Sequence, residues 1–378
     1  MASKKKKIRT EFKKNRTPRA RPTDWTRKYA GEALDEDKIA REERLSGKGE
    51  LTRRRTVVGI ETDADAGLDV LRDVDASECV AGRVLSVHGL TSTVAGDDGR
   101  EYRCATRRLL KTLLTEQRNV VAAGDRVAVR PANAGATEGI IERIEPRRNS
   151  LSRTFRGRQH VLVANVDQLA IVGSAAEPYL KPNLIDRFLL TAEKNRIRPI
   201  VCINKVDLID ATELQPLVGV YAQLGYDVLL LSATTGFGVE RLRRRLCGAA
   251  TVICGQSGVG KSSLLNAAEP GLGLKIGEIS EETQKGKHTT TAARLIPLAA
   301  GGYVVDTPGI RQFQLWDVIP EEVSGFYRDL RPFENLCAFP DCTHIHEAAC
   351  AVKDAVADGQ LDARRYESYC QVREGDEA

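Results

Sequence analysis

The chain has 378 residues, and 42% of them are hydrophobic, so it is long enough for two or three domains with ordinary buried cores. Its 57 basic and 52 acidic residues give a formal net charge of +5. No stretch approaches the roughly 18–20 apolar residues that a membrane-spanning helix needs, and the basic N-terminus lacks the apolar segment of a signal peptide. We therefore expect a cytoplasmic protein without a membrane partner.

The first 77 residues are charged and show little hydrophobic periodicity, so we expect a basic, mostly disordered extension with at most a helical turn around Asp35–Leu45. Residues 1–28 hold seven lysines and five arginines against Glu11 and Asp24, a net charge of +10. A basic arm on a slightly acidic body is typical of nucleic-acid-binding proteins. The pattern favours contact with RNA over a tail that only improves solubility.

Residues 78–147 consist of short alternating runs separated by turn residues such as the Asp98–Gly99 pair. The predicted strands are Gly82–Val87, Thr91–Ala95, Glu101–Ala105, Arg126–Arg130 and Glu138–Ile144. Five short strands in a segment of this length favour a small all-β barrel, and we expect an OB-fold. Another small barrel that serves only as a spacer is the alternative.

Residues 148–318 alternate between strands and helices, which predicts a parallel or mixed α/β sheet covered on both faces. The predicted strands are Leu169–Gly173, Pro199–Ile203, Asp227–Leu231, Thr251–Cys254, Arg294–Leu298 and Tyr303–Val305. The predicted helices are Pro182–Asn195, a helix from about Asp210, Val239–Leu246 and Lys261–Ala268. Residues 319–378 are predicted to be helical, with a break at a cluster of cysteine and histidine.

A glycine-rich motif carries the strongest functional signal. Residues 255–262 read Gly-Gln-Ser-Gly-Val-Gly-Lys-Ser, which fits the G-x-x-x-x-G-K-[ST] phosphate loop between an apolar strand and a helix. Glycines permit the tight turn in which backbone N–H groups face phosphate oxygens, and the helix adds the positive end of its dipole. Lys261 is expected to bind the β- and γ-phosphates and Ser262 a Mg²⁺ ion. The predicted phosphate-binding residues are Gly255, Gln256, Ser257, Gly258, Val259, Gly260, Lys261, Ser262 and Ser263.

A second motif predicts which base the bound nucleotide carries. The segment Asn204–Asp207, Asn-Lys-Val-Asp, follows an apolar strand, so its side chains emerge at the carboxyl end of the sheet, where α/β proteins bind ligands. The Asp207 carboxylate can accept the N1–H and the 2-amino group of guanine, an arrangement that adenine lacks. After the next strand, Ser232-Ala233 offers a backbone N–H to the guanine carbonyl. The predicted guanine-binding residues are Asn204, Lys205, Asp207, Ser232 and Ala233.

A third motif, Asp306-Thr-Pro-Gly309, follows the last predicted strand. Asp306 can hold Mg²⁺ through water, and the N–H of Gly309 can contact the γ-phosphate. Between this motif and the phosphate loop lies the polar segment 286–291, Gly-Lys-His-Thr-Thr-Thr, in the place of a switch loop. The predicted magnesium ligands are Ser262, Asp306 and one of Thr289, Thr290 and Thr291.

The order of these motifs is unusual. Ordinary G domains run from the phosphate loop to D-x-x-G and then to the guanine-reading motif, whereas here Asn204 precedes Gly255 by 51 residues and no similar motif follows Gly309. A permuted sheet can keep every contact, because the termini of a domain usually lie close together at its surface. We therefore predict a circularly permuted G domain that binds GTP and GDP.

The position that orients water in many GTPases, a glutamine after D-x-x-G, is Ile310 here. Intrinsic hydrolysis should therefore be slow, and another group must position the water. His288 in the predicted switch loop is the candidate catalytic residue. A solvated loop histidine without a catalytic role is the alternative.

The nine cysteines of a cytoplasmic protein do not indicate a disulfide framework, but three of them cluster. The spacing Cys337-x4-Cys342-x-His344-x5-Cys350 fits a closed tetrahedral site for one structural Zn²⁺. A set of buried thiols is the alternative, which the polar and turn-rich character of the segment disfavours. His346 and Cys370 are spare candidate ligands, left over when the first four are taken.

In this order, the motifs resemble those of the RsgA (YjeQ) family of small-ribosomal-subunit biogenesis GTPases, over roughly residues 79–370. The phosphate loop, the switch segment, Asp306–Gly309 and the cysteine-histidine spacing carry the resemblance, and Asn149–Arg153 resembles the family's join between barrel and G domain. The resemblance implies an N-terminal OB-fold, a permuted GTPase domain and a C-terminal zinc-binding domain. It also implies binding to the 30S subunit and its 16S rRNA, with hydrolysis stimulated by that subunit and with His288 implicated in it. We expect a monomer.

Two classes of function fit these features. One is an enzyme whose GTP turnover is triggered by the 30S subunit and drives its own release, and the other is a nucleotide-gated RNA-binding module in which hydrolysis is incidental. Stimulation of turnover by 30S subunits separates the two. A kinase or a transporter-linked ATPase that uses ATP is disfavoured by Asn204–Asp207 and by the lack of membrane segments.

Overall fold

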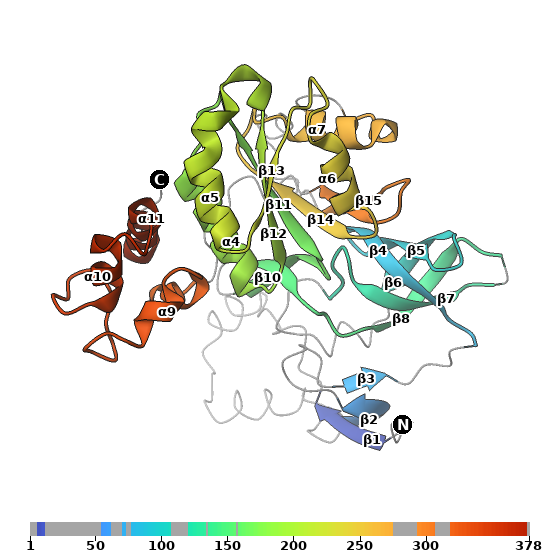
Figure 1. Ribbon diagram of the computed structural model, residues 1–378. Helices are drawn as coiled ribbons and strands as arrows, with labels where there is room; N and C mark the ends of the chain where they lie inside the picture. The colour runs from blue at the N-terminus through green and yellow to red at the C-terminus, as the bar shows by residue number, and fades with distance from the viewer. Residues whose placement is uncertain are drawn as a thin grey trace, which may run out of the picture.

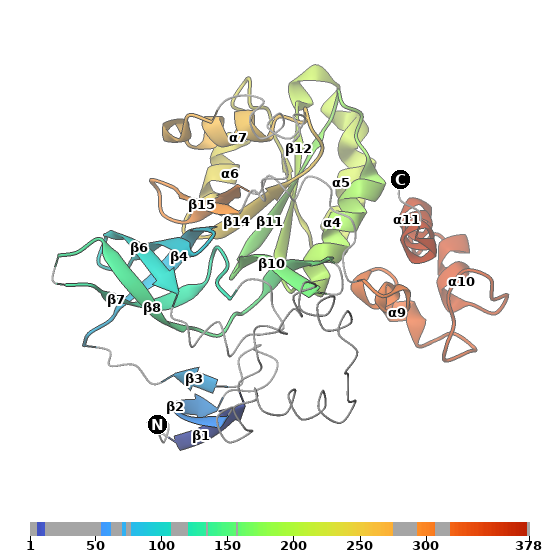
Figure 2. The ribbon, with the colours of Figure 1, turned by 180° about the vertical axis from the view of Figure 1, so that it is seen from behind.

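The structure of the chain is a computed structural model that describes residues 6–11, 54–61, 70–72, 77–106, 120–133, 135–155, 158–274, 293–306 and 318–375. A small sheet, a β-barrel, a larger α/β unit and a C-terminal helical segment follow one another along the chain (Figures 1 and 2). None of the described helices is long and apolar enough to cross a membrane.

Three short strands precede the barrel. β1 (Lys6–Glu11), β2 (Arg54–Glu61) and β3 (Val70–Arg72) form an antiparallel sheet in the order β1-β2-β3. These three strands were not predicted from the sequence, which indicated a mostly disordered extension over residues 1–77. The signal in β2 was a run of β-branched residues, Thr-Val-Val, which was hidden by the arginines beside it. The expected helical turn at Asp35–Leu45 lies outside the described residues.

The five predicted strands of the barrel are confirmed. They are β4 (Val80–His88), β5 (Thr91–Gly96), β6 (Glu101–Thr106), β7 (Arg126–Pro131) and β8 (Glu138–Ile144). They pair in the order β4-β5-β6-β8-β7, and β4 also pairs with β7, which closes the barrel. Only the β6–β8 pair within the barrel is parallel. Inward-facing side chains such as Val84, Val94, Val129 and Ile141 fill its core.

The α/β unit is built on a mixed sheet, as predicted. Its strands are β11 (Gln168–Ser174), β12 (Arg198–Asn204), β13 (Asp227–Leu230), β14 (Ala250–Cys254), β15 (Arg294–Pro297) and β16 (Tyr303–Asp306). They pair in the order β13-β12-β11-β14-β16-β15, and β15 is antiparallel to β16 while the other five strands run parallel. All the carboxyl ends of the parallel strands therefore lie at one edge.

Helices cover both faces of this sheet (Figure 1). α4 (Pro182–Lys194) and α5 (Gln215–Gln223) bury Phe188 and Tyr221 in one core, and α6 (Val239–Leu246) and α7 (Lys261–Ala268) bury Leu242 and Leu264 in the other. The helix predicted from Asp210 begins with a 3-10 turn, Ala211–Leu214, in which the Asp210 side chain accepts the N–H of Thr212. The α-helix itself starts only at residue 215.

A β-hairpin that the sequence did not predict joins the barrel to the sheet. β9 (Ser150–Phe155) and β10 (Arg158–Ala164) pair with each other, and Val163 forms a parallel bridge with Ala123 of the barrel segment. The Asn165 side chain reinforces the joint, because its amide donates to the Gly124 carbonyl (3.1 Å). These contacts hold the barrel against the α/β unit.

The C-terminal segment packs on α4. It contains 3-10 turns at Pro320–Glu322 and Ser324–Phe326 and the helices α9 (Arg331–Glu334), α10 (Ala351–Ala357) and α11 (Ala363–Glu374). Leu190 of α4 lies in the same core as Tyr327 and Tyr369 of this segment. The buried Asp186 carboxylate of α4 pairs with Arg364 (3.0 Å) and Arg365 (2.7 Å). Apolar packing and a buried charge network thus attach the segment to the sheet's helical layer.

Candidate functional site

The glycine-rich loop connects β14 to α7 and turns as tightly as its sequence predicts. Gly255, Gly258 and Gly260 have φ values of 136°, 81° and 90°. A Cβ on Gly255 would lie 2.1 Å from the Val172 carbonyl oxygen, and one on Gly260 would lie 2.4 Å from Nδ2 of Asn204. Only glycine fits these positions, and α7 starts directly after them, so its free N–H groups face the loop.

Lys261 is buried at the start of α7, where its side chain folds back over the loop. Its ammonium group donates to the carbonyl oxygens of Gly255 (3.0 Å) and Gln256. Both acceptors belong to the loop itself, so the charge lies within reach of any phosphate that the loop N–H groups bind. Ser262, the next residue, is also buried in the first turn of the helix. This arrangement is the one expected of a phosphate loop.

Asn204 brings three separate segments together. It ends β12 with only 2% of its surface exposed. Its Nδ2 donates to the Val259 carbonyl in the phosphate loop (2.8 Å), and its Oδ1 accepts the N–H of Ala233 (3.2 Å). The predicted guanine motif, the Ser232-Ala233 segment and the phosphate loop therefore meet at one edge of the sheet, although they are far apart in sequence.

The other predicted guanine-binding residues lie next to Asn204 in the chain or in the neighbouring turn. Lys205 has a left-handed backbone (φ 65°), and Asp207 lies exposed in the 3-10 turn Val206–Leu208. Ser232 is buried, and its hydroxyl accepts the N–H of Thr235 (3.0 Å). The carboxylate of Asp207 is thus free to face a ligand, while Ser232 holds the turn that presents the N–H of Ala233.

One residue beside the guanine motif, Ser174, was not predicted from the sequence. The Ser174 hydroxyl donates to the Glu177 carbonyl (3.0 Å), and the Lys205 ammonium donates to the same oxygen. Ser174 is buried at the carboxyl end of β11, directly opposite Asn204 in the sheet register. A polar residue that ends an apolar strand next to the strand of the guanine motif was the signal that pointed to this position.

The magnesium side of the site is described only in part. Asp306 ends β16, which pairs with β14, so its backbone lies beside the strand that leads into the phosphate loop. Ser262 and Ser263 occupy the first turn of α7. The other predicted residues lie outside the described part of the chain: Gly309, His288, Thr289, Thr290 and Thr291.

A second cluster lies in the C-terminal segment. Cys337, Cys342, His344 and Cys350 place one ligand atom each within 4.8 Å of one another. His344 Nδ1 lies 3.4 Å from Sγ of Cys337 and 3.5 Å from Sγ of Cys350, and these two sulfur atoms are 3.9 Å apart. A tetrahedral zinc ion with its usual bond lengths separates its ligand atoms by roughly 3.5–3.8 Å. The four residues therefore fit one Zn²⁺ ion, and they leave no position for a substrate.

The loop around this cluster is held by its own hydrogen bonds. The Tyr366 and Tyr369 hydroxyls donate to the carbonyls of His344 and Thr343, both at 2.7 Å. Burial alone would raise the pKa of Glu347, but N–H groups that include that of Thr343 bind its carboxylate and bring the pKa down to about 2. Burial also lowers the pKa of His344, which favours the neutral imidazole that binds metals.

Comparison with known proteins places these features in a family. Residues 144–316 match the family model of the RsgA GTPase. The small ribosomal subunit biogenesis GTPase RsgA of Actinobacillus pleuropneumoniae (serotype 5b, strain L20) is 38% identical over 309 residues, which are 80% of this chain and 87% of that protein. The protein of the same name from Ectopseudomonas mendocina is 42% identical over 292 residues, which are 76% of this chain and 81% of that protein.

Two crystal structures share the fold. YjeQ from Thermotoga maritima is 35% identical, with a TM-score of 0.65 over 78% of this chain and 98% of that chain. YloQ, described as a circularly permuted GTPase, is 30% identical, with a TM-score of 0.62 over 80% of this chain and 97% of that chain. The strand order agrees with permutation, because the guanine motif follows β12 and the phosphate loop follows the later strand β14.

Proposed function

Because this chain belongs to the RsgA family of GTPases, we propose that it acts in late maturation of the small (30S) ribosomal subunit, binding 16S rRNA and hydrolysing GTP there. The chain is a GTP hydrolase with a circularly permuted G domain. The single observation that supports the proposed site best is the bridge that Asn204 makes between the phosphate loop and Ala233. On this account the protein works in the cytoplasm as a monomer.

The nucleotide is bound by the residues that Asn204 brings together. The Asp207 carboxylate accepts from guanine, and the N–H of Ala233 exchanges its bond to Asn204 for one to the guanine carbonyl. Lys261 with the N–H groups of residues 255–263 holds the phosphates. When bound, Mg²⁺ neutralises charge on the β- and γ-phosphates. Ser262, Asp306 and one of Thr289, Thr290 and Thr291 would hold it.

Hydrolysis is assigned to His288. Ile310 follows the D-x-x-G motif and offers no hydrogen bond to water, whereas His288 directly precedes the threonines expected to close on Mg²⁺. Binding to the 30S subunit would place the imidazole at the γ-phosphate, and general acid-base catalysis of this kind contributes about 10²–10⁴-fold. His288→Ala should keep GTP affinity and 30S association but lose most of the stimulated rate in single-turnover hydrolysis. If His288→Ala hydrolyses GTP on 30S subunits as fast as the wild type, His288 has no catalytic role.

The barrel and the C-terminal segment with its metal centre contribute to binding of the 30S subunit. The order β4-β5-β6-β8-β7 with closure between β4 and β7 supports an OB-fold, whose members bind oligonucleotides. Cys337, Cys342, His344 and Cys350 would hold one structural Zn²⁺ that fixes the C-terminal segment. The three units 78–147, 148–318 and 319–378 would then contact the subunit together, with residues 1–77 as a basic extension.

A nucleotide-gated RNA-binding module is the second candidate, because the barrel and the basic extension can bind RNA without hydrolysis. Co-sedimentation with purified 30S subunits tests the shared part of both proposals. We expect the protein to sediment with the subunit when a non-hydrolysable GTP analogue is bound and to be released with GDP. Equal sedimentation in both nucleotide states would contradict nucleotide control of docking, and none in either state would remove the 30S subunit as the partner.

A further inference from the structure

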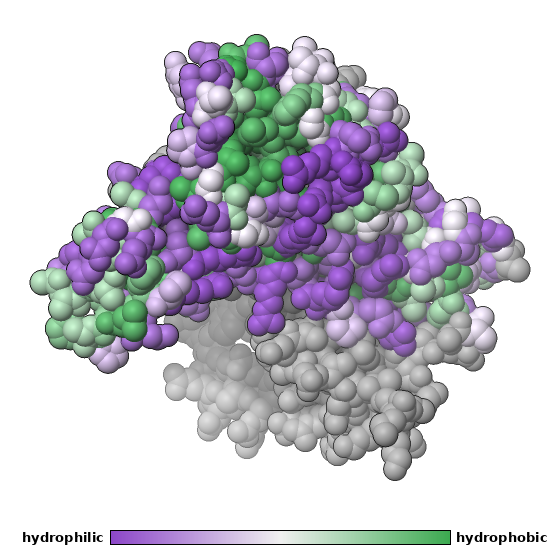
Figure 3. Space-filling model, viewed as in Figure 1, coloured by the Kyte–Doolittle hydropathy of each residue, from purple (hydrophilic) through white to green (hydrophobic). Residues whose placement is uncertain are grey.

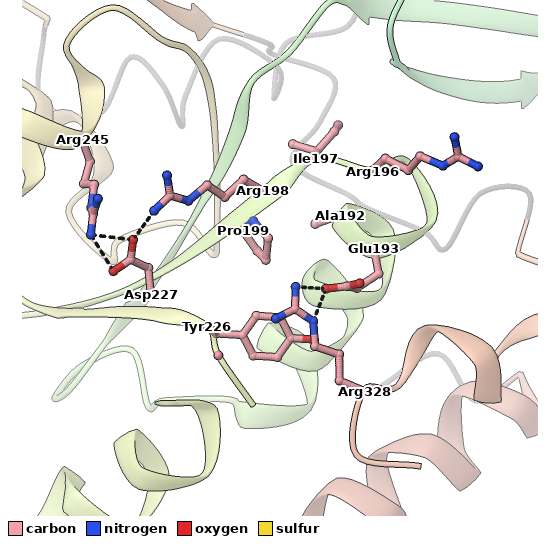
Figure 4. Close-up of a pocket in the computed structure, with 11 residues that line it drawn as sticks. Ala192, Glu193, Arg196, Ile197, Arg198, Pro199, Tyr226, Asp227, Arg245 and Arg328 are labelled. Carbon is pink, nitrogen blue, oxygen red and sulfur yellow. Dashed lines mark hydrogen bonds and ion pairs between the residues drawn. The ribbon is translucent and has the colours of Figure 1, made fainter. Parts of the chain in front are cut away.

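A cavity of about 650 Å³ lies at the edge of the sheet opposite the nucleotide site (Figure 4). Its lining comes from the end of α4, the starts of β12 and β13, the end of α6 and the C-terminal segment. Arg198 begins β12 and Asn204 ends it, so about 20 Å of strand separates the cavity from the guanine motif. Changes in the cavity can therefore be made without touching the nucleotide.

Positive charge dominates the cavity. Its charged lining residues are Arg196, Arg198, Arg245, Arg328, Glu193 and Asp227, which leaves two positive charges in excess. Asp227 pairs with Arg198 and with Arg245, both at 2.9 Å, and Glu193 pairs with Arg328 at 2.7 Å. These carboxylates orient three guanidinium groups and neutralise only part of their charge. Arg198 remains 57% exposed at its side chain despite the pair.

Two groups in the lining lack partners among the described residues. Arg196 has no carboxylate partner there, and its side chain extends away from Glu193 and Asp227 in Figure 4. The Tyr226 hydroxyl is buried without a hydrogen bond, and the Arg328 guanidinium lies over the Tyr226 ring, 4.3 Å from its centroid.

The charge continues onto α6. Val239, Leu242 and Leu246 are buried, while Arg241 and Arg244 are exposed on the opposite side of the helix. Figure 3 shows hydrophilic residues over α6 and below it. None of the large hydrophobic side chains that are exposed in the described residues belongs to α6 or lines the cavity. The surface therefore lacks the apolar anchors of a protein interface.

We propose that this surface, the arginine face (Arg196, Arg198, Arg241, Arg244 and Arg245), binds the phosphate backbone of small-subunit rRNA. The inference rests on the proposed function and adds to it a docking surface on the G domain itself. Guanidinium groups bind phosphate in a bidentate manner and keep their charge, which suits a surface of arginines without lysine. The Asp227 carboxylate holds Arg198 and Arg245 of this face in position before RNA arrives.

The test uses two double variants, R196Q/R198Q and R241Q/R244Q, in the full chain. Arg243→Gln is the matched control, because Arg243 is exposed on the same helix but lies about 160° around it from Arg245. Affinity for 16S rRNA and for 30S subunits is measured against salt concentration with a non-hydrolysable GTP analogue bound. Loss of two phosphate contacts lowers the slope of log K against log salt by roughly 1.4–1.8 in each double variant. Arg243→Gln should change the slope of log K against log salt by much less than one.

GTP affinity without subunits should stay within about twofold of the wild type in all variants. Arg198 lies about 20 Å along β12 from Asn204, and Arg241, Arg243 and Arg244 are exposed side chains of α6 outside the predicted nucleotide-binding residues. Wild-type slopes in both double variants would overturn the inference while leaving the proposed function intact. Weaker binding to 30S subunits with unchanged binding to 16S rRNA would also overturn it, because the face would then contact a ribosomal protein. Failure of the wild type to bind 30S subunits would instead defeat the proposed function.

Discussion

At the scale of single residues, Asn204 and Gly260 form a complementary pair. The Asn204 amide occupies the space that a Cβ on residue 260 would need, and it uses that proximity to hold the Val259 carbonyl. Its other end holds the N–H of Ala233. Removing the amide would leave the Val259 carbonyl and the Ala233 N–H without this partner, so Asn204 fixes the glycine-rich loop and the Ser232-Ala233 turn to each other.

Asp207→Asn tests the reading of the base. An amide presents a donor where the carboxylate accepts, so the variant should lose its preference for guanine nucleotides and bind xanthine nucleotides instead. Equilibrium binding of GDP and XDP to both proteins measures the change, and we expect the ratio of the two affinities to invert.

Lys261→Ala is the control for that experiment, because it should weaken binding of both nucleotides without changing their ratio. An Asp207→Asn variant that still prefers GDP by the wild-type ratio would mean that residues 204–207 do not read the base.

At the scale of elements, the cysteine-histidine cluster is expected to stabilise the C-terminal segment. Cys337, Cys342 and Cys350 are packed with the same apolar core as Tyr327 and Tyr369, so loss of the ion would expose that core. Purified protein should contain one zinc per chain, and Cys342→Ser should lose it. The C-terminal segment should then become sensitive to protease, while GDP affinity stays within about threefold.

Cys370→Ser is the matched control, since Cys370 lies in α11 outside the four-residue cluster. It should retain the zinc. Metal analysis that finds no zinc in freshly purified wild-type protein would contradict the assignment, as would a Cys342→Ser variant that keeps its metal.

The strands and helices of the barrel and of the α/β sheet were predictable from their apolar patterns and from the glycine or polar residues that bound them. β12 is a continuous apolar run that ends at Asn204, and α6 has helical spacing and follows Gly238. The hairpin β9–β10 was not, because its stability comes from contacts with the barrel, such as the Ala123–Val163 bridge, rather than from its own pattern. Ser174 was missed for the same reason: its role depends on the Glu177 carbonyl and on Asn204 in the neighbouring strand. Spacing predicted that the four residues of the cysteine-histidine cluster lie together, while the arginine face emerged only once β12, β13 and α6 were brought together.

At the scale of the whole molecule, Asp186 links the sheet's helical layer to the C-terminal segment. Its carboxylate is fully buried and accepts the Tyr221 hydroxyl as well as two arginines. Asp186→Asn should destabilise the protein by roughly 3 kcal/mol in chemical denaturation, near the low end for a broken buried pair, because Arg365 keeps its bond to Asp329.

Glu322→Gln provides the comparison. It breaks the exposed Lys194–Glu322 pair between the same two parts of the chain, which should cost about 0–1 kcal/mol. Equal effects of Asp186→Asn and Glu322→Gln would show that the buried network does not hold the C-terminal segment in place.

The barrel, the G domain and the C-terminal segment act as one unit only if docking on the subunit controls GTP hydrolysis. Steady-state GTP turnover by the wild-type protein, measured with and without purified 30S subunits, tests that claim most directly. The account predicts slow turnover by the protein alone, since Ile310 cannot orient water, and a rate at least about 10²-fold higher at saturating 30S subunits. Equal rates with and without subunits would contradict it and leave a nucleotide-gated RNA-binding module in its place.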